Sequence, residues 1–387
     1  MKPCPRLPAR RARRGFTLIE LMVAVAIGMV LVLALTTVMV RHDAGKRTMV
    51  SSNDLSLTSS YLAFSLDREL RSAGSGITQN WRDNFGCLLR VARGGAQILP
   101  RAAAFPAPFD TVPQQVRLAP LLVHAGAGAN GSDVIAVATG ASGIGETPIR
   151  VQPASATAVD LRVTSTVGLR GNDLVLIAED GIGCTVQQLA SPFAGGATQL
   201  VSFGGTYAQS EIDSLALTSF STAGTAFLSP LGNTTGNRPA LRLYGVAAEG
   251  TLVSHDMLQL DGTDDVQPLV DGVIDLRALY GVDTNADGRI DAWVSPTDAN
   301  YTAAALTAGT PAARERLLSI MAVRVGMVLR SDRIEREDVA PTSLTLFSDL
   351  DAGLQHTHNI ATADRKQRFR AVEFTVPLRN VMLTART

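Results

Sequence analysis

The chain has 387 residues, of which 46% are hydrophobic, 18% are charged and 5% are aromatic. This length is enough for one large domain or two ordinary ones, and the composition excludes wholesale disorder. The formal net charge is zero, but the first fifteen residues hold six basic side chains and no acidic one. Without these six, 29 of the 35 basic residues remain against 35 acidic ones, a net charge of −6. We therefore expect no direct nucleic-acid binding by phosphate neutralisation over the bulk surface.

A long apolar run follows the basic leader. Residues 16–40 contain a single charged side chain, Glu20. A helix of this length spans roughly 37 Å, which is enough to cross the hydrocarbon core of a membrane. The basic residues place the leader on the cytoplasmic side, so the rest of the chain faces outward. An ordinary secretory signal is cut after the apolar run, but no persuasive site of that kind follows Val40.

The junction RRGFTLIELMVA resembles the type IV prepilin signature, without a departure from Gly15 to Leu21. The resemblance implies that a prepilin peptidase cuts between Gly15 and Phe16 and methylates the new N-terminal Phe16. It also implies a partner for Glu20, the N-terminal ammonium of Phe16 on a neighbouring subunit. A carboxylate inside a membrane span costs several kcal/mol unless it is paired. Such a pair would fix the axial register of subunits entering a filament. The alternative is a plain signal anchor with a stray glutamate.

The sequence predicts four regions: a leader (1–15), a transmembrane helical part (16–40), a periplasmic amphipathic helical part (41–75) and a head (76–387). No proline interrupts residues 16–99, and Gly74 and Gly76 are the predicted helix stops. The amphipathic part carries an apolar stripe at helical spacing, formed by Leu55, Leu62, Leu66, Leu70 and Ala73.

Short apolar runs separated by turn residues predict a largely antiparallel, β-rich head. The expected fold class is therefore α+β and pilin-like, with a long N-terminal helix packed on that head. The glycine-rich and proline-rich segments 94–132 and 191–239 are expected to be loops or irregular insertions. Strands are predicted at 133–139, 160–166, 172–179, 240–247, 251–260, 273–282, 319–331, 344–348 and 369–380.

Several segments resemble the PilW-like minor pilins, in the order that this family shows. They are LDRELRSAG, GSDVIAVAT, LVDGVIDLRALYGVDTNADGRIDAW, AVRVGMVLRS and FRAVEFTVPLRN. The resemblance implies a minor pilin of a type IV pilus system, anchored in the inner membrane with its head in the periplasm and then carried to the cell-surface pilus. Its partners would be other minor pilins, the major pilin and the inner-membrane assembly platform. It would prime or tip the filament and so support adhesion, twitching motility or DNA uptake.

Two alternatives remain open at this point. One is a pseudopilin of a type II secretion system, which shares the N-terminal machinery. The other is a monomeric, calcium-binding surface protein held by an uncleaved anchor.

An Asp-rich segment, 283–294, has the spacing of a calcium loop. Gly288 permits the turn, and Val294 stands where an EF-hand carries its bidentate glutamate, so this is not an EF-hand. The missing ligand is expected from Asp298, Asp275 or water, and a metal-free Asx turn is the alternative. We expect a structural Ca²⁺ bound by Asp283, Asn285, Asp287, the carbonyl of Arg289 and Asp291.

Cys4 lies in the leader, which leaves Cys87 and Cys184 as a pair in an exported chain. We expect them to form a disulfide, and two buried free thiols are the alternative. His356 and His358 form an H-x-H pair, but the surrounding residues predict a loop and no third ligand is evident. The sequence contains neither a nucleophile elbow nor a complete phosphate-binding loop. We therefore expect no enzymatic activity.

Overall fold

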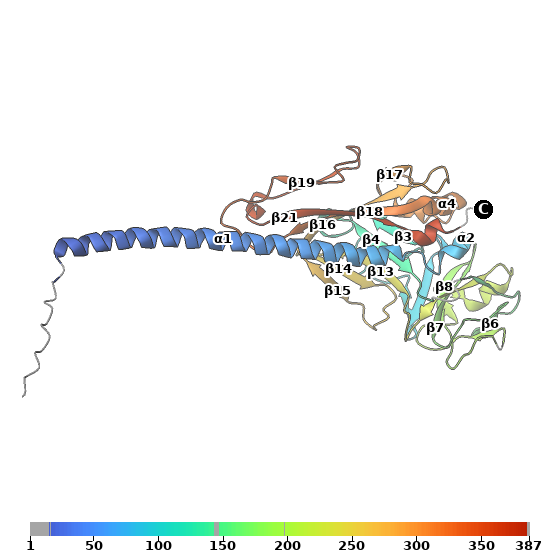
Figure 1. Ribbon diagram of the computed structural model, residues 1–387. Helices are drawn as coiled ribbons and strands as arrows, with labels where there is room; N and C mark the ends of the chain where they lie inside the picture. The colour runs from blue at the N-terminus through green and yellow to red at the C-terminus, as the bar shows by residue number, and fades with distance from the viewer. Residues whose placement is uncertain (1–14, 16, 143–146, 197, 385–387) are drawn as a thin grey trace, which may run out of the picture. The chain divides into compact units, whose positions relative to one another are not determined.

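The computed structural model describes residue 15 and residues 17–142, 147–196 and 198–384. The chain forms two compact units, Met1–Asp54 and Leu55–Thr387. Most of the predicted leader and Phe16 lie outside the described residues, so the cleavage and methylation at Phe16 stay predictions. Figure 1 shows the long helix α1 and the β-rich head.

Helix α1 (Leu18–Arg71) is one uninterrupted helix, as the sequence predicts. It ends just before Gly74, whose φ of +85° is the left-handed conformation expected at a helix stop. A Cβ atom at Gly74 would lie 2.6 Å from Cγ2 of Thr78, so the position also lacks room for a side chain. The Asn380 side chain donates to the carbonyls of Ser72 and Ala73 at 3.1 and 3.0 Å, just beyond the end of the helix.

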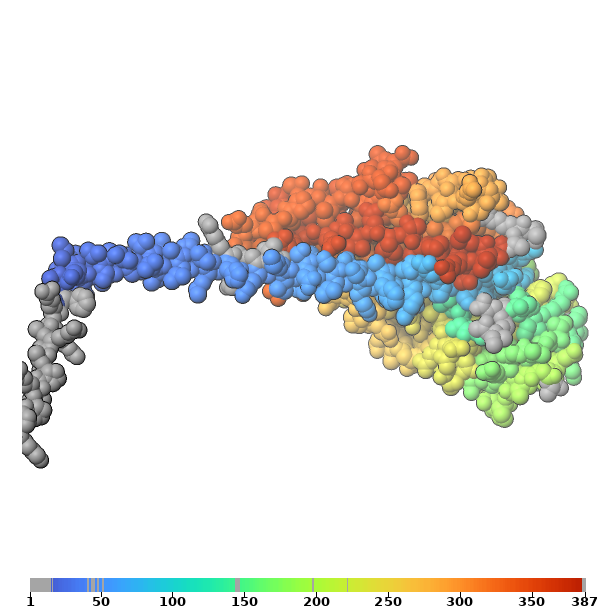
Figure 2. Space-filling view, viewed as in Figure 1, coloured from blue at the N-terminus to red at the C-terminus, as the bar shows by residue number. Residues whose placement is uncertain are grey.

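The predicted apolar stripe on the second half of α1 is buried. Leu62, Leu66 and Leu70 belong to the largest core cluster, together with residues of two sheets of the head. Figure 2 shows this part of the helix, in light blue, against the orange and red C-terminal part of the head. The Arg370 guanidinium adds a polar contact, because Nη1 donates to Oγ of Ser56 at 2.6 Å.

Three main sheets build the head, and nearly all of their strand pairs are antiparallel. The exception is the pair formed by β1 and β8. The six-stranded sheet has the order β2-β1-β8-β7-β12-β5, with β1 (Leu89–Arg93), β2 (Ala96–Leu99), β5 (Ile149–Arg150), β7 (Asp173–Glu179), β8 (Gly183–Gln188) and β12 (Phe227–Asn233). The five-stranded sheet has the order β15-β14-β13-β4-β3, with β3 (Leu121–His124), β4 (Val134–Thr139), β13 (Ala240–Val246), β14 (Thr251–Asp256) and β15 (Val266–Asp271).

The third sheet is long-stranded and carries the features discussed below. Its order is β17-β16-β18-β21, with β16 (Val273–Val282), β17 (Ala292–Val294), β18 (Ile320–Arg330) and β21 (Phe369–Pro377). The two-stranded pairs are β6 (Asp160–Arg162) with β9 (Leu200–Ser202), β10 (Glu211–Ile212) with β11 (Leu215–Ala216), and β19 (Ser343–Leu346) with β20 (His356–Asn359). The short helices are α2 (Trp81–Asn84), α3 (Ala303–Leu306), α4 (Pro311–Ser319) and α5 (Arg379–Met382), and the 3-10 turns are Thr78–Asn80, Ala129–Gly131, Leu217–Ser221 and Thr362–Asp364.

The two segments expected to be loops contain strands, which corrects that prediction. The larger correction is β12, which lies inside the six-stranded sheet between β7 and β5. Its pairing with β7 shifts register between Pro230 and Gly232. A proline and a glycine inside a strand are read from sequence as breakers, but a bulge accommodates both of them. The other strands in these segments are β2, β3, β9, β10 and β11.

The predicted loop around His356 and His358 is also wrong, because these residues form strand β20. With β19 it makes a hairpin that covers β16 and β18 of the four-stranded sheet. Leu346 and Phe347 of the hairpin are buried in a cluster with Leu279 and Val328. Gly326 on β18 leaves room for this contact, since a Cβ there would lie 2.8 Å from Cζ of Phe347.

The predicted disulfide is present and joins Cys87 to Cys184, with Cα atoms 5.9 Å apart. Cys87 lies two residues before β1, and Cys184 lies on β8, the parallel neighbour of β1. The bond therefore links the segment between α2 and β1 to strand β8 of the six-stranded sheet.

Candidate functional site

The start of α1 is a reciprocal cap formed by Thr17 and Glu20. Glu20 accepts hydrogen bonds through Oε2 from the backbone N–H and the hydroxyl of Thr17, at 3.0 and 2.9 Å. In return the Glu20 N–H donates to Oγ1 of Thr17 at 3.3 Å. This arrangement is a capping box, which satisfies two N–H groups of the first turn. The T-x-x-E spacing of a capping box is present in the sequence. The sequence analysis nevertheless assigned Glu20 only an intermolecular partner.

The first part of α1 presents its apolar side chains to the outside. The 22 residues Leu18–Met39 form a helical segment that is long and apolar enough to cross a membrane. Its most apolar part has no residue buried within the chain. So much exposed apolar surface requires lipid or another apolar partner. The segment can therefore serve both as a membrane anchor and as a contact surface for other helices.

The second half of α1 has an exposed apolar stripe in addition to its buried one. Leu57, Tyr61 and Phe64 are 63%, 59% and 68% exposed, and their spacing places them on one face of the helix. We call these three residues the outer stripe. Because the helix buries a different face against the head, the outer stripe is free to contact a partner.

The Asp-rich loop follows β16 directly and folds around Asp283. This side chain is only 2% exposed, and it accepts backbone hydrogen bonds from Ala286 at 2.7 Å and Gly288 at 3.0 Å. Gly288 has a φ of +84°, which fits its predicted role in the turn. Asp291 accepts from the hydroxyl and N–H of Thr284, both at 2.7 Å, and these bonds hold the pKa of its carboxyl below the usual value.

The remaining predicted ligands, Asn285 and Asp287, are exposed on the same loop. Oδ1 of Asn285 accepts from the Asp287 N–H, and Oδ1 of Asp287 accepts from the Arg289 N–H, both at 2.9 Å. All five predicted ligand residues thus lie in this one loop. Its carboxylates are nevertheless engaged in hydrogen bonds within the loop.

Of the two additional carboxylates that the sequence offered, Asp275 lies away from the loop. Asp275 sits near the start of β16, eight residues before Asp283, which is about 26 Å along an extended strand. Asp298 accepts from the Asn300 N–H at 2.9 Å within a turn of its own. The prediction of Asp275 as a ligand of the loop is therefore wrong.

Asp275 instead meets the two histidines of β20. In the part of the chain that the structure describes, Asp275, His356 and His358 form the one group of three ligand side chains whose donor atoms lie within 4.8 Å of one another. An alternating strand points both rings to the same face. Their partner was missed because it lies 81 and 83 residues away in sequence.

Comparisons with known proteins match two parts of the chain. Residues 233–380 match the family model described as type IV pilus-assembly protein W. Residues 10–36 match the prokaryotic N-terminal methylation motif, which covers the predicted cleavage junction and Glu20. No curated protein and no solved structure matches the chain.

Proposed function

We propose, from the premise that the chain is a PilW-like type IV pilin, that it acts as a minor pilin. In this role it is anchored in the inner membrane by Leu18–Met39, with its head in the periplasm. After processing it joins other minor pilins and the major pilin, primes or tips the filament, and so supports adhesion, twitching motility or DNA uptake. The observation that carries the proposal is the pairing of a methylation motif at one end with a PilW match in the head.

The surface of α1 supports assembly through the helix. An apolar anchor with no cover of its own can exchange lipid for neighbouring helices without a large change in the polarity of its surroundings. The outer stripe is a second exposed apolar surface, formed by Leu57, Tyr61 and Phe64. A filament core built from such helices would bury both.

Glu20 has two candidate roles, and they make different demands on its charge. As a partner of a neighbouring N-terminal ammonium it must be a carboxylate, because an uncharged group cannot offset a cation in an apolar environment. As a member of the capping box it needs only a hydrogen-bond acceptor, which glutamine also provides.

A comparison of Glu20→Gln with Glu20→Ala separates these roles. We expect both variants to be cut after Gly15 but neither to enter sheared filaments, because both lack the negative charge. The measurement is mass spectrometry of the N-terminus in membrane and filament fractions. If Glu20→Gln enters filaments like the wild type and Glu20→Ala does not, the cap explains the requirement and the intermolecular pair is wrong.

The same fractions test the function as a whole. Methylated Phe16 in the filament fraction of the wild type is the expected result. A strain that lacks the protein should lose surface pili and regain them when the intact chain is supplied. Normal piliation together with lost protein export would favour a type II secretion pseudopilin, and an uncut chain found only in membranes would contradict both.

We also propose that the Asp-rich loop binds a structural Ca²⁺. Hard oxygen ligands at alternating positions of a tight loop suit this ion. Calcium should raise the melting temperature of the wild type but not that of Asp287→Ala, because the substitution removes one of the predicted ligands. Asp287 is exposed, so its removal leaves no cavity in the core. Asp351→Ala, at another exposed aspartate, is the matched control. Equal shifts in Asp287→Ala and the control would exclude the loop as the site.

A further inference from the structure

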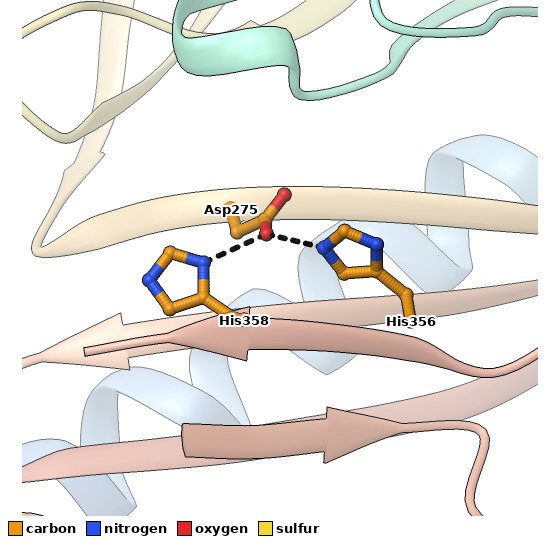
Figure 3. Close-up of side chains that lie close together, drawn as sticks. All are labelled: Asp275, His356 and His358. Carbon is orange, nitrogen blue, oxygen red and sulfur yellow. Dashed lines mark hydrogen bonds and ion pairs between the residues drawn. The ribbon is translucent and has the colours of Figure 1, made fainter. Parts of the chain in front are cut away.

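Two histidines of the β19–β20 hairpin converge on one carboxylate of β16. Figure 3 shows the rings of His356 and His358 on either side of Asp275. Nε2 of His356 and Nδ1 of His358 each lie 2.9 Å from the same oxygen, Oδ2 of Asp275. Asp275 is buried, whereas the side chains of His356 and His358 are 31% and 22% exposed. The cluster therefore has a fixed base and an open side that solvent and ions can reach.

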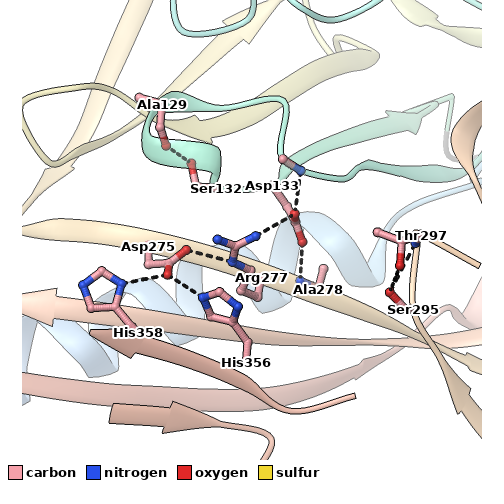
Figure 4. A network of polar contacts seen from close by, with 11 residues as sticks. Ala129, Ser132, Asp133, Asp275, Arg277, Ala278, Ser295, Thr297, His356 and His358 are labelled. Atoms are coloured by element: carbon pink, nitrogen blue, oxygen red, sulfur yellow. Dashed lines mark hydrogen bonds and ion pairs between the residues drawn. The ribbon is translucent and has the colours of Figure 1, made fainter. Parts of the chain in front are cut away.

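A second layer of contacts holds the Asp275 carboxylate in place (Figure 4). Its other oxygen, Oδ1, accepts from Nε of Arg277 at 2.9 Å. Arg277 also lies against Asp133, with Nη1 3.5 Å from Oδ1. Asp133 is itself buried and accepts from the N–H groups of Gly126 and Ala278 at 2.9 and 3.0 Å.

The surroundings of Asp275 act on its carboxyl in two opposite directions. Burial raises the pKa of Asp275, but hydrogen bonds from the two histidines and the nearby Arg277 charge outweigh it and leave the pKa below the usual value. The carboxyl groups of Asp275 and Asp133 both face the single guanidinium of Arg277.

We propose that Asp275, His356 and His358 form a binding site for a divalent transition-metal ion such as Zn²⁺. Two imidazole nitrogens and one carboxylate oxygen are ligands that zinc prefers, whereas calcium prefers oxygen alone. Ligand atoms of a tetrahedral zinc at about 2.0–2.1 Å lie roughly 3.3 Å apart. The three candidate ligand atoms lie within 4.8 Å of one another, with both nitrogens 2.9 Å from Oδ2 of Asp275. Zinc binding therefore requires the two rings to shift and to exchange their hydrogen bonds with the carboxylate for bonds to the metal. Water from the open side completes the coordination.

The role of this ion is to fasten the hairpin to the sheet. Asp275 belongs to β16, whereas both histidines belong to β20, so a metal bound by all three links segments far apart in sequence. Arg277 acts as a positioning residue, because it orients the carboxylate through the oxygen that does not face the histidines.

The test uses the full-length chain in detergent, without a histidine tag, in buffer that contains calcium. We expect one Zn²⁺ per chain by equilibrium dialysis and elemental analysis. Outer-shell residues of metal sites typically contribute about 10–100-fold in affinity, so loss of a ligand in His356→Ala or His358→Ala should weaken binding at least about tenfold. Zinc should also raise the melting temperature of the wild type but not that of the double variant His356→Ala/His358→Ala.

Two control variants keep the result specific. His42→Ala removes a histidine outside the head, and Asp287→Ala alters the Asp-rich loop, so both should bind zinc like the wild type. Circular dichroism checks that the histidine variants stay folded. The proposal is overturned if the wild type binds no stoichiometric zinc or if the double histidine variant binds it equally well. Binding without a rise in melting temperature would overturn the fastening role.

Discussion

His124, at the end of β3, illustrates how burial alone sets a charge state. Loss of hydration lowers its pKa to about 4, so the imidazole remains neutral in the folded head across the mildly acidic range. The unfolded chain protonates the same residue near pH 6.5. Because the unfolded state takes up the proton first, this residue destabilises the fold as the pH falls below about 6.5.

We expect His124→Gln to remove that part of the acid sensitivity. Between pH 7 and pH 5 the wild type should lose up to about 2 kcal/mol of unfolding free energy through His124, since each pKa unit corresponds to about 1.4 kcal/mol. Urea unfolding of both proteins at the two pH values measures the difference. Equal losses in the two proteins would contradict the role of His124.

At the scale of single residues, a contact was predictable where residue type or spacing marks both partners, and it was missed where nothing marks one of them. The pairing of Cys87 with Cys184 followed from a count of cysteines in an exported chain. The capping box of Thr17 and Glu20 has the recognisable sequence pattern T-x-x-E. The partner of His356 and His358 was out of reach, because no local pattern marks an aspartate on a distant strand as their neighbour.

The second half of helix α1 has two apolar faces with different roles, one buried against the head and one exposed. The buried stripe stabilises the head, whereas the outer stripe makes no comparable contribution to the fold. Tyr61 and Leu62 are adjacent in sequence, yet they are 59% and 1% exposed. Substitutions on the two faces should therefore separate assembly from stability.

We expect the double variant Tyr61→Ala/Phe64→Ala to keep its melting temperature but to enter filaments poorly. Exposed substitutions usually change stability by less than about 0.5 kcal/mol. The control is Leu62→Ala, which should cost about 2–5 kcal/mol of unfolding free energy because it leaves a cavity in the core. Filament content relative to membrane content measures the effect. Wild-type incorporation of the double variant would exclude the outer stripe as an assembly surface.

Elements with a clear period were predicted well, and those that break the period were missed. Apolar runs in the sequence predicted strands β16, β18 and β21 with bounds close to the observed ones. Strand β12 contains Pro230 and Gly232, and a bulge conceals its continuity from any reading of local propensity. Strand β20 is short and polar, so it owes its extended form to packing on the sheet below it.

The sheet order of the whole head depends on contacts that no local pattern encodes. Strand β4 pairs with β13, about a hundred residues later in sequence, and β1 pairs with β8 at a similar separation. The sequence predicted a largely antiparallel head, but it gave no basis for the division into three main sheets. The parallel pair of β1 and β8 departs from the antiparallel pattern, and the disulfide lies beside that pair.

We expect the Cys87–Cys184 bond to be a principal support of the head. The cysteines are 97 residues apart, so the bond restricts a long stretch of the unfolded chain. Cys87→Ser/Cys184→Ser should lower the unfolding free energy by about 2–5 kcal/mol. Denaturant unfolding with and without a reductant measures this, and the reductant should have no effect on the double variant. Equal midpoints for the oxidised wild type and the variant would contradict the prediction.

The cap at the start of α1 gives proteolytic processing an electrostatic consequence. A cut between Gly15 and Phe16 creates a cationic end one residue before Thr17, next to the positive pole of the helix. A positive charge there is unfavourable by about 0.3–1 kcal/mol, and methylation does not remove it. Glu20 lies in the first turn of the same helix, where its carboxylate can offset that cost. A cut at this junction would change the end of the helix from a neutral peptide into a charge that needs a counterion.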